Sequence, residues 1–300
     1  MKESARCACS WLFVGTIPEA DYPLTLAPCT AKEGTLFLGE RACSVHRGTP
    51  AMLAAAAAAY EELGAKNSGN ALYALVAGDT GNGAGSRAVY EKLLNVLPDL
   101  QPRGVTFHYL LPDVDWHNRI LLAMESLERR PLLAADAGYM YAAKMSGYAQ
   151  SYDLFTPDIG ELAFLADDKA PHPFYTRNFL LADEARAEEL VGKAYACGNA
   201  ARHLLVKGKV DRYVHKGKVL AVVDSPDVPM LEPVGGTGDT VTGIVSALLA
   251  AEKGMGEACT AALKTNRRMG YLAHPTPASS VSDLLLFLPS AVRLECITVP

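Results

Sequence analysis

The chain has 300 residues, of which 50% are hydrophobic and 20% charged, and its formal net charge is −5 at pH 7. This composition is typical of a globular protein with a sizeable core, and the negative charge argues against a nucleic-acid-binding groove. No stretch has the length of a membrane span, and the apolar run at 11–14 is too short for a secretory signal, so we expect a cytoplasmic protein that does not bind membranes.

The first 70 residues match no known pattern that we can place. Residues 1–48 indicate short strands and turns, with the clearest strand at 35–38. Thr49 and Pro50 have the residue types preferred at the start of a helix, and the alanine run that follows predicts a tightly packed helix to about residue 63.

From residue 71 onward, predicted strands alternate with predicted helices. The strands lie at 72–77, 105–111, 131–136, 153–156 and 203–207, with a hairpin at 211–223. The helices lie at 87–97, 118–129, 183–196, 239–252 and 257–272, with a short one near 160. This alternation favours a parallel sheet covered on both faces, with ligands bound beyond the carboxyl ends of the strands. No Pro-, Gly- and Ser-rich linker divides the chain, so we expect a single domain over 1–300.

The segment Gly235-Gly236-Thr237-Gly238-Asp239 opens an apolar helix and carries the strongest functional signal. The first N–H groups of a helix are unpaired and carry a partial positive charge, so they can hold a phosphate. An acid in that turn would be repelled by phosphate unless it had a task there, such as taking a proton from an attacking hydroxyl. The segment therefore predicts phosphoryl chemistry, and the alternative is a structural glycine loop capped by Asp239.

Three weaker signals lie at other predicted strand ends. The loop 78–86 suits close backbone approach to a phosphate or dinucleotide, but it lacks a P-loop G-K-[ST], and a plain turn explains it about as well. Asp158 and Glu161 could hold water, Mg²⁺ or substrate near phosphates, or could simply cap a helix. Lys207 could meet a nucleotide phosphate beside Gly208, or could be a solvated turn lysine.

Metal-binding and hydrolytic motifs give no competing prediction. His108, Asp113, Asp115 and His117 crowd into one strand and loop, but their spacing matches no closed zinc site, so we predict no metal ligand among them. There is no G-x-S-x-G, H-E-x-x-H or paired C-x-x-C motif. The seven scattered cysteines indicate reduced thiols rather than a disulfide framework.

Taken together, the order of these segments resembles the ribokinase-like superfamily. Within it, the chain is most similar to the ADP- or ATP-dependent NAD(P)H-hydrate dehydratases related to the C-terminal part of YjeF proteins. The resemblance covers a core of about residues 71–272 and rests on the segments 83–84, 136–138, 156–161, 207–208 and 236–239. It implies a single-domain three-layer α/β/α sandwich with a mostly parallel central sheet.

The resemblance also implies roles for individual residues. Asp239 would act at the reacting hydroxyl as the catalytic residue. The nucleotide would be bound by Lys207, Gly208, Gly236, Thr237 and Gly238. The substrate would be bound by Gly83, Ala84, Asp136, Asp158 and Glu161. The implied ligands are ADP or ATP, Mg²⁺ (with Glu161 acting through a metal-bound water) and hydrated NADH or NADPH, whose ring hydroxyl is phosphorylated before phosphate leaves.

The chain departs from the family pattern at three places. Asp158 replaces the usual histidine, and Asp211 stands where a threonine follows the Lys-Gly turn, placing an acid near the presumed phosphates. The segment 111–115 replaces a Gly-Pro-Gly loop. These changes leave open a kinase of the same superfamily, acting on a sugar or a vitamin-precursor alcohol, and a nucleotide-binding protein without catalysis. In each case we expect small-molecule nucleotide partners and a homo-oligomer.

Overall fold

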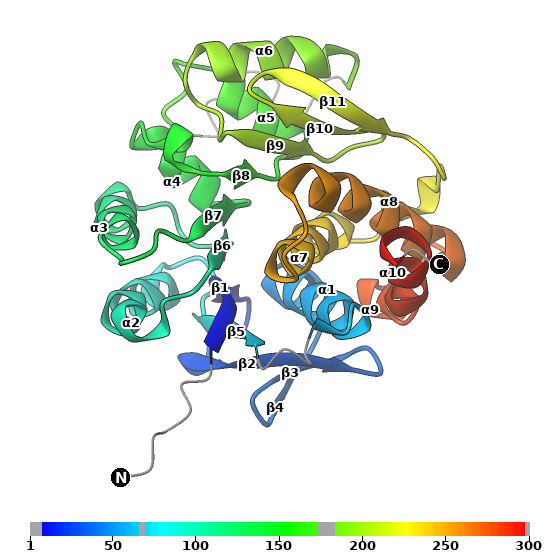
Figure 1. Ribbon diagram of the computed structural model, residues 1–300, viewed down its shortest axis with the longest axis horizontal. Coiled ribbons are helices and arrows are strands. Elements are labelled where there is room, and N and C mark those ends of the chain that lie inside the picture. Colours follow the sequence, from blue (N-terminus) through cyan, green and yellow to red (C-terminus); the bar gives the residue numbers. More distant parts are fainter. Residues whose placement is uncertain (1–7, 66–69, 173–183, 298–300) are drawn as a thin grey trace.

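The computed structural model describes residues 8–65, 70–172 and 184–297, in which helices cover both faces of a central sheet (Figure 1). The strands are β1 (Ala8–Ile17), β2 (Thr25–Lys32), β3 (Thr35–Leu38), β4 (Arg41–Cys43), β5 (Asn70–Gly78), β6 (Gly104–His108), β7 (Leu132–Ala135), β8 (Leu154–Phe155), β9 (His203–Val206), β10 (Asp211–His215) and β11 (Lys218–Val223). The helices are α1 (Thr49–Glu62), α2 (Ala84–Leu100), α3 (Val114–Glu125), α4 (Tyr139–Met145), α5 (Ile159–Ala166), α6 (Ala187–Ala196), α7 (Thr237–Ala250), α8 (Met255–Ala273), α9 (Val281–Leu285) and α10 (Leu288–Cys296). Short 3-10 turns are η2 (Ala149–Ser151), η4 (Glu184–Arg186) and η5 (Pro229–Leu231).

Across the described residues the sheet has 11 strands in the order β11-β10-β9-β8-β7-β6-β1-β5-β2-β3-β4. From β9 to β5 all neighbours pair in parallel. Both ends of the sheet pair antiparallel, through β10 and β11 at one edge and β2, β3 and β4 at the other. The predicted α/β/α sandwich with a parallel central sheet is therefore confirmed, and the antiparallel β2–β4 edge adds to it.

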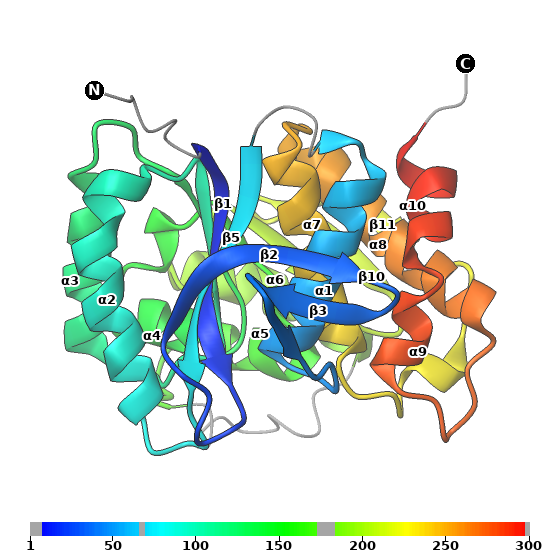
Figure 2. The ribbon, with the colours of Figure 1, turned by 90° about the horizontal axis from the view of Figure 1, so that it is seen from below.

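The N-terminal segment supplies the centre of the sheet. β1 lies between β5 and β6, and its Leu12, Phe13 and Val14 are fully buried. Because helices cover both faces of this strand, its sequence is continuously apolar rather than alternating. β2 and β3 then run past α1 (Figure 2).

Small residues allow α1 and α7 to pack closely on one face of the sheet. A Cβ atom at Gly243 of α7 would lie 2.1 Å from the carbonyl oxygen of Met52 in α1. Ala51 and Ala55 of α1 are fully buried in the same core. α8, α9 and α10 complete this face, and α2 to α6 cover the other (Figure 1). The close α1–α7 contact brings the N-termini of both helices to the same edge of the sheet.

The predicted elements are present with shifted ends, and α4, α9 and α10 were not predicted. β6 ends at His108 instead of 111 because Tyr109 turns the chain with a φ of +48°. α2 begins at Ala84, directly after Gly83. Asp183, the predicted start of a helix, lies outside the described residues, as does Cys7, and the other cysteines are free thiols. No helix within the described ranges combines the length and hydropathy needed to cross a bilayer.

Replacing Gly243 with alanine tests the α1–α7 contact. The added methyl group would overlap the Met52 backbone, so we expect a loss of about 1–3 kcal/mol in the free energy of unfolding, measured by urea denaturation. Gly192→Ala in α6 is the matched control, because a Cβ there meets nothing within 4 Å. It should gain about 0.5–1 kcal/mol from the better helix former. Equal effects of the two substitutions would contradict the close contact.

Candidate active site

The carboxyl ends of the parallel strands gather the charged residues of the site. His108 ends β6, Asp136 follows β7 and Lys207 follows β9. β6 and β7 are neighbours in the sheet, with β8 between β7 and β9, so these three side chains meet at one edge. Asp239 joins them from the first turn of α7.

Each carboxylate oxygen of Asp239 lies within hydrogen-bond distance of a neighbouring group. The N–H of Gly48, the N-cap residue of α1, donates to Oδ2 at 2.6 Å, and Nε2 of His108 lies 3.1 Å from Oδ1. The side chain of Asp239 is 13% exposed, so it is mostly shielded from water but still reachable by a bound hydroxyl. This placement is suited to a general base.

His108 is fully buried and was not singled out as part of this site from the sequence. Its Nδ1 lies 3.0 Å from Thr49 Oγ1, and its Nε2 lies 3.6 Å from Asp136 as well as 3.1 Å from Asp239. A carboxylate can only accept hydrogen bonds, so we assign the proton to Nε2, which donates to Asp239, while the Thr49 hydroxyl donates to Nδ1. His108 therefore links α1 to the aspartate of α7.

The other members of the polar cluster seen in the sequence lie apart from His108. Asp113 caps α3 by accepting from the N–H of Trp116 at 3.1 Å. His117 is buried among aromatic rings and lies 2.9 Å from the Tyr152 hydroxyl. The signal that could have separated His108 from them is its place as the last residue of a buried strand that faces α7.

Lys207 and Asp136 form a buried ion pair beside His108. The Nζ of Lys207 lies 3.0 and 2.9 Å from the two oxygens of Asp136, and the Thr242 hydroxyl donates to the same carboxylate at 2.6 Å. Burial opposes the charged form of both groups, but mutual attraction outweighs it, so the pKa of Asp136 is lowered and that of Lys207 is raised. Lys207 is therefore charged, but its charge is largely balanced by Asp136.

The N-terminus of α7 has unpaired N–H groups. Gly236 caps it in the left-handed region with a φ of 99°, and no side chain caps it. Within the described residues, no hydrogen bond engages the N–H groups of Gly236, Thr237 or Gly238. A Cβ at Gly238 would lie 3.8 Å from Lys207 Nζ, and one at Gly235 would lie 3.9 Å from Cδ of Arg47. The helix start that the sequence predicts as a phosphate site is thus an open, positively polarised helix end with two basic side chains beside it.

The other glycine-rich loop, between β5 and α2, is filled by its own aspartate. Asp79 accepts from the N–H groups of Gly81, Gly83 and Ser86 at 2.9, 3.1 and 2.9 Å. Burial would raise the pKa of Asp79, but these hydrogen bonds outweigh it and lower the pKa. The N–H of Ala84 is also engaged within the loop. These donors are therefore not free for a phosphate, and any substrate contact of Gly83 and Ala84 would use other atoms.

Asp158 and Glu161 cap the start of α5. Asp158 Oδ1 accepts from the Glu161 N–H and Glu161 Oε2 accepts from the Asp158 N–H, both at 2.8 Å. The Tyr141 hydroxyl donates to Glu161 Oε1 at 2.9 Å. Burial, followed by the charges of Asp158 and Asp136, raises the pKa of Glu161 to about 8. Glu161 is therefore mainly protonated at neutral pH, which makes it a poor ligand for a metal-bound water in the ligand-free protein.

Asp211 lies at the Lys207–Gly208 turn, as the sequence suggested, but its charge is compensated by Arg267. Nε of Arg267 lies 2.7 Å from Asp211 Oδ2, with both side chains buried. Asp211 also accepts from the Gly208 N–H at 2.9 Å, and Arg267 donates to the carbonyls of Gly208 and Lys209 at 3.2 and 2.7 Å. The pair neutralises the acid and fixes the turn that carries Lys207 and Gly208.

The segment that replaces the expected Gly-Pro-Gly loop is fastened to α2. The Leu111 N–H donates to Ser86 Oγ at 3.0 Å, and its carbonyl accepts from the Tyr90 hydroxyl at 2.8 Å. A Cβ at Gly83 would lie 2.4 Å from Leu111 Cδ2. An apolar side chain therefore covers Gly83 where flexible glycine backbone was expected.

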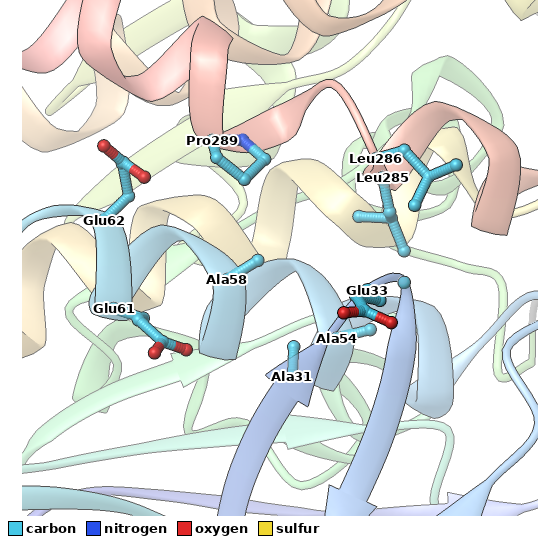
Figure 3. Close-up of a pocket in the computed structure, with 10 residues that line it drawn as sticks. Ala31, Glu33, Ala54, Ala58, Glu61, Glu62, Leu285, Leu286 and Pro289 are labelled. Carbon is cyan, nitrogen blue, oxygen red and sulfur yellow. The ribbon is translucent and has the colours of Figure 1, made fainter.

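Two surface hollows of about 300 Å³ each lie outside the charged cluster. The first, between the β2–β3 turn, α1 and α9–α10, carries Glu33, Glu61 and Glu62 and includes none of the site residues (Figure 3). The second is lined by Asp227, Val228, Pro229, Met230, Gly270, Tyr271, His274 and Pro275. Gly270, which lines this hollow, lies one turn of α8 beyond Asn266, and the Asn266 side chain donates to the Thr237 carbonyl at 3.2 Å. The second hollow therefore adjoins the N-terminus of α7.

Two sequence comparisons relate the chain to known proteins. Residues 112–287 match the model of a family described as NAD(P)H-hydrate dehydratase. The uncharacterized protein MJ1337 of Methanocaldococcus jannaschii is 34% identical over 220 residues, which span 73% of this chain and 90% of the relative.

Solved structures share the fold at low identity. A ribokinase-like superfamily protein of Enterococcus faecalis superposes with a TM-score of 0.57 at 14% identity, covering 99% of this chain and 92% of that one. Pyridoxal kinase of Staphylococcus aureus in complex with ADP gives 0.52 at 16%, covering 86% and 87%. Phosphofructokinase-2 of Escherichia coli in complex with fructose-6-phosphate gives 0.52 at 14%, covering 95% and 100%. The ribokinase-like fold implied by the sequence is therefore confirmed.

The raised pKa of Glu161 predicts a pH-dependent stability. In the folded protein Glu161 keeps its proton up to about pH 8, whereas an ordinary glutamate, as in the unfolded chain, releases it near pH 4.5. The stabilisation that comes from this bound proton is fully present below pH 4.5 and is lost as the pH rises toward 8. Glu161→Gln is uncharged at every pH. We therefore expect its free energy of unfolding to fall less than that of the wild type between pH 5 and 8, as measured by urea denaturation.

Glu189→Gln is the control, because the ion pairs of Glu189 with Arg186 and Lys193 lower its pKa to about 2, outside this window. Identical pH profiles of the wild type and Glu161→Gln would show that Glu161 is not protonated in the fold.

Proposed function

Because the chain belongs to the NAD(P)H-hydrate dehydratase family, we propose that it removes water from hydrated NADH or NADPH by phosphoryl transfer from ATP or ADP. The observation that carries this proposal is the pairing of Asp239 with the open N-terminus of α7. Unpaired N–H groups are suited to a phosphate, and the carboxylate in the same turn is suited to a hydroxyl beside it.

In the proposed reaction, the ring hydroxyl of the hydrate attacks the terminal phosphorus of the nucleotide. The bond from that phosphorus to the rest of the nucleotide breaks, and the hydroxyl proton passes to Asp239. Phosphate then leaves the ring carbon, a proton is lost from the neighbouring carbon, and the double bond is restored. The α7 N-terminus and the adjacent Arg47 supply positive potential to the phosphoryl group in transfer, whereas the charge of Lys207 is largely balanced by Asp136.

The nucleotide is proposed to run from the α7 N-terminus along α8. Asn266 connects the two helices, and the hollow one turn further on presents Met230 and the ring of Tyr271, both at least 40% exposed. Such apolar and aromatic surface is suited to the flat base of a nucleotide. This placement leaves the opposite side of Asp239, toward Tyr109 and Gly83, for the hydrate.

The acids of this edge fit Mg²⁺ in part. Ligand atoms of His108, Asp136 and Asp239 lie within 4.8 Å of one another, but Asp136 is already paired with Lys207, and Mg²⁺ prefers oxygen ligands to imidazole. Asp158 is exposed, and its backbone pairs with that of Lys207 in a parallel β-bridge. Asp158 is therefore the carboxylate best suited to accept hydrogen bonds from the water ligands of Mg²⁺. A bound Mg²⁺ would neutralise charge on the phosphates.

Replacing Asp239 with asparagine removes the proposed proton acceptor. We expect the rate of hydrate conversion to fall by about 10²–10⁴-fold, followed by the recovery of dihydronicotinamide absorbance. Calorimetry should find nucleotide affinity nearly unchanged. Asp115→Asn, also in the first turn of a helix but 82% exposed, should behave as wild type.

The same assay separates the alternatives. A stable phosphorylated product from a small alcohol, with no recovery of absorbance from the hydrate, would identify a kinase instead. The covered Gly83 and the replaced Gly-Pro-Gly loop favour that alternative, because both lie on the substrate side. Nucleotide binding without turnover of any acceptor would point to a non-catalytic protein.

His108 is proposed to position Asp239. His108→Leu removes the hydrogen bond to Oδ1, so the carboxylate loses its orientation, and we expect kcat to fall about 10–100-fold with nucleotide affinity unchanged. His108→Gln retains an amide donor at the position of Nε2 and should recover part of the rate. Equal rates for the two variants would mean that the hydrogen bond has no role in positioning.

A further inference from the structure

Tyr109 follows β6 directly and is held in a strained conformation. Its φ of +48° lies in the left-handed region, which is costly for a residue with a bulky side chain. The N–H of Tyr109 donates to the Ala137 carbonyl at 3.2 Å, and its carbonyl accepts from the Thr16 hydroxyl at 2.5 Å. The Tyr109 backbone is thus hydrogen-bonded at the ends of β1 and β7, the two strands that flank β6. These hydrogen bonds fix the direction of its side chain.

The ring of Tyr109 lies against the two groups that hold Asp239. It meets the His108 ring edge to face at 4.6 Å, and a Cβ at Gly48 would lie 3.8 Å from the ring. Burial, followed by the charges of Asp239 and Asp136, raises the pKa of its hydroxyl, so the neutral hydroxyl lies within the field of the acid cluster. The residue nevertheless stays 49% exposed.

The same loop extends this surface toward Gly83. Leu110 points inward and is 1% exposed, whereas Leu111 is 40% exposed and covers Gly83. Two exposed side chains of this loop are therefore aromatic or apolar: Tyr109 beside His108 and Leu111 over Gly83. Ligand sites commonly combine apolar or aromatic side chains with a few polar groups, as Tyr109 and Leu111 do beside Asp239.

We propose that Tyr109 packs on the acceptor, and that this acceptor carries an unsaturated, partly planar ring rather than being a free sugar. Tyr109 packs on both groups that contact the Asp239 carboxylate, so an acceptor whose hydroxyl reaches Asp239 would lie beside the exposed Tyr109 ring. The exposed ring face would pack on the acceptor ring, with Leu111 against its outer edge. This inference rests on the proposed function for the reaction, but it adds the residue that selects the acceptor.

The test compares Tyr109→Leu, Tyr109→Phe and Tyr148→Leu. Calorimetry measures binding of NADH hydrate in the presence of a non-hydrolysable ATP analogue, and steady-state assays give KM and kcat. We expect Tyr109→Leu to weaken hydrate binding and raise its KM by roughly tenfold while kcat changes little, because an aromatic contact is lost but Asp239 is not. Tyr109→Phe retains the ring and should stay within roughly twofold of wild type on the same scale.

Tyr148→Leu is the matched control, because Tyr148 is 46% exposed, close to the value for Tyr109, and it should leave both parameters unchanged. Leucine meets the same left-handed strain as tyrosine, and thermal unfolding of each variant checks that the fold persists. Unchanged hydrate affinity in Tyr109→Leu would overturn the inference, as would an equal loss in Tyr148→Leu.

A second pair of probes separates this inference from the reaction. If wild-type protein neither binds nor converts NADH hydrate, the proposed function fails, and calorimetry is repeated with pyridoxal and with ribose. Binding of pyridoxal that weakens in Tyr109→Leu would still support the packing role. Tighter binding of ribose than of pyridoxal, or pyridoxal binding that Tyr109→Leu does not weaken, would overturn it.

Discussion

The carboxylate of Asp239 joins three elements that are distant in the sequence, and the site depends on this junction. One oxygen accepts from Gly48 at the start of α1, and the other lies beside His108 at the end of β6. Both contacts require that α1 and α7 start at the same edge of the sheet, which the small residues between the helices permit. The group proposed to take a proton is therefore positioned by the same packing that forms the core, and its orientation cannot vary independently of the fold.

Some charged groups at this edge of the sheet are paired with an opposite charge, and others are not. Lys207 and Asp136 balance each other, as do Arg267 and Asp211 beneath the neighbouring turn. What remains for an anion is the set of unpaired N–H groups at the start of α7 and the adjacent Arg47. This division lets an acid-rich site accept a phosphate, because Asp136 and Asp211 already have cationic partners, which leaves Asp239 as the one acid of the group without one among the described residues.

The sequence predicted the alternating core and the strand ends at which Asp136, Lys207 and Asp239 gather, because buried parallel strands and glycine-rich helix starts leave local patterns. It did not predict β1 as the central strand, since strand order depends on contacts far apart in the chain. His108 was overlooked for the same reason: its partners lie 59 and 131 residues away. The sequence placed Asp211 near the Lys207–Gly208 turn but did not reveal its ion pair, because Arg267 lies on a distant helix. The single domain over 1–300, the homo-oligomer, the cytoplasmic location and the site roles stay predictions.

The β5–α2 loop carries its own anion, and this has a consequence for binding. Three backbone N–H groups converge on Asp79, whose lowered pKa keeps it ionised through the neutral range. The loop is therefore ordered before any ligand arrives, and binding of an acceptor does not carry the entropic cost of ordering it. Such preorganisation favours affinity through rigidity rather than through added contacts. Leu111 and Gly83 would then present one shape, and that shape would discriminate among acceptors by fit.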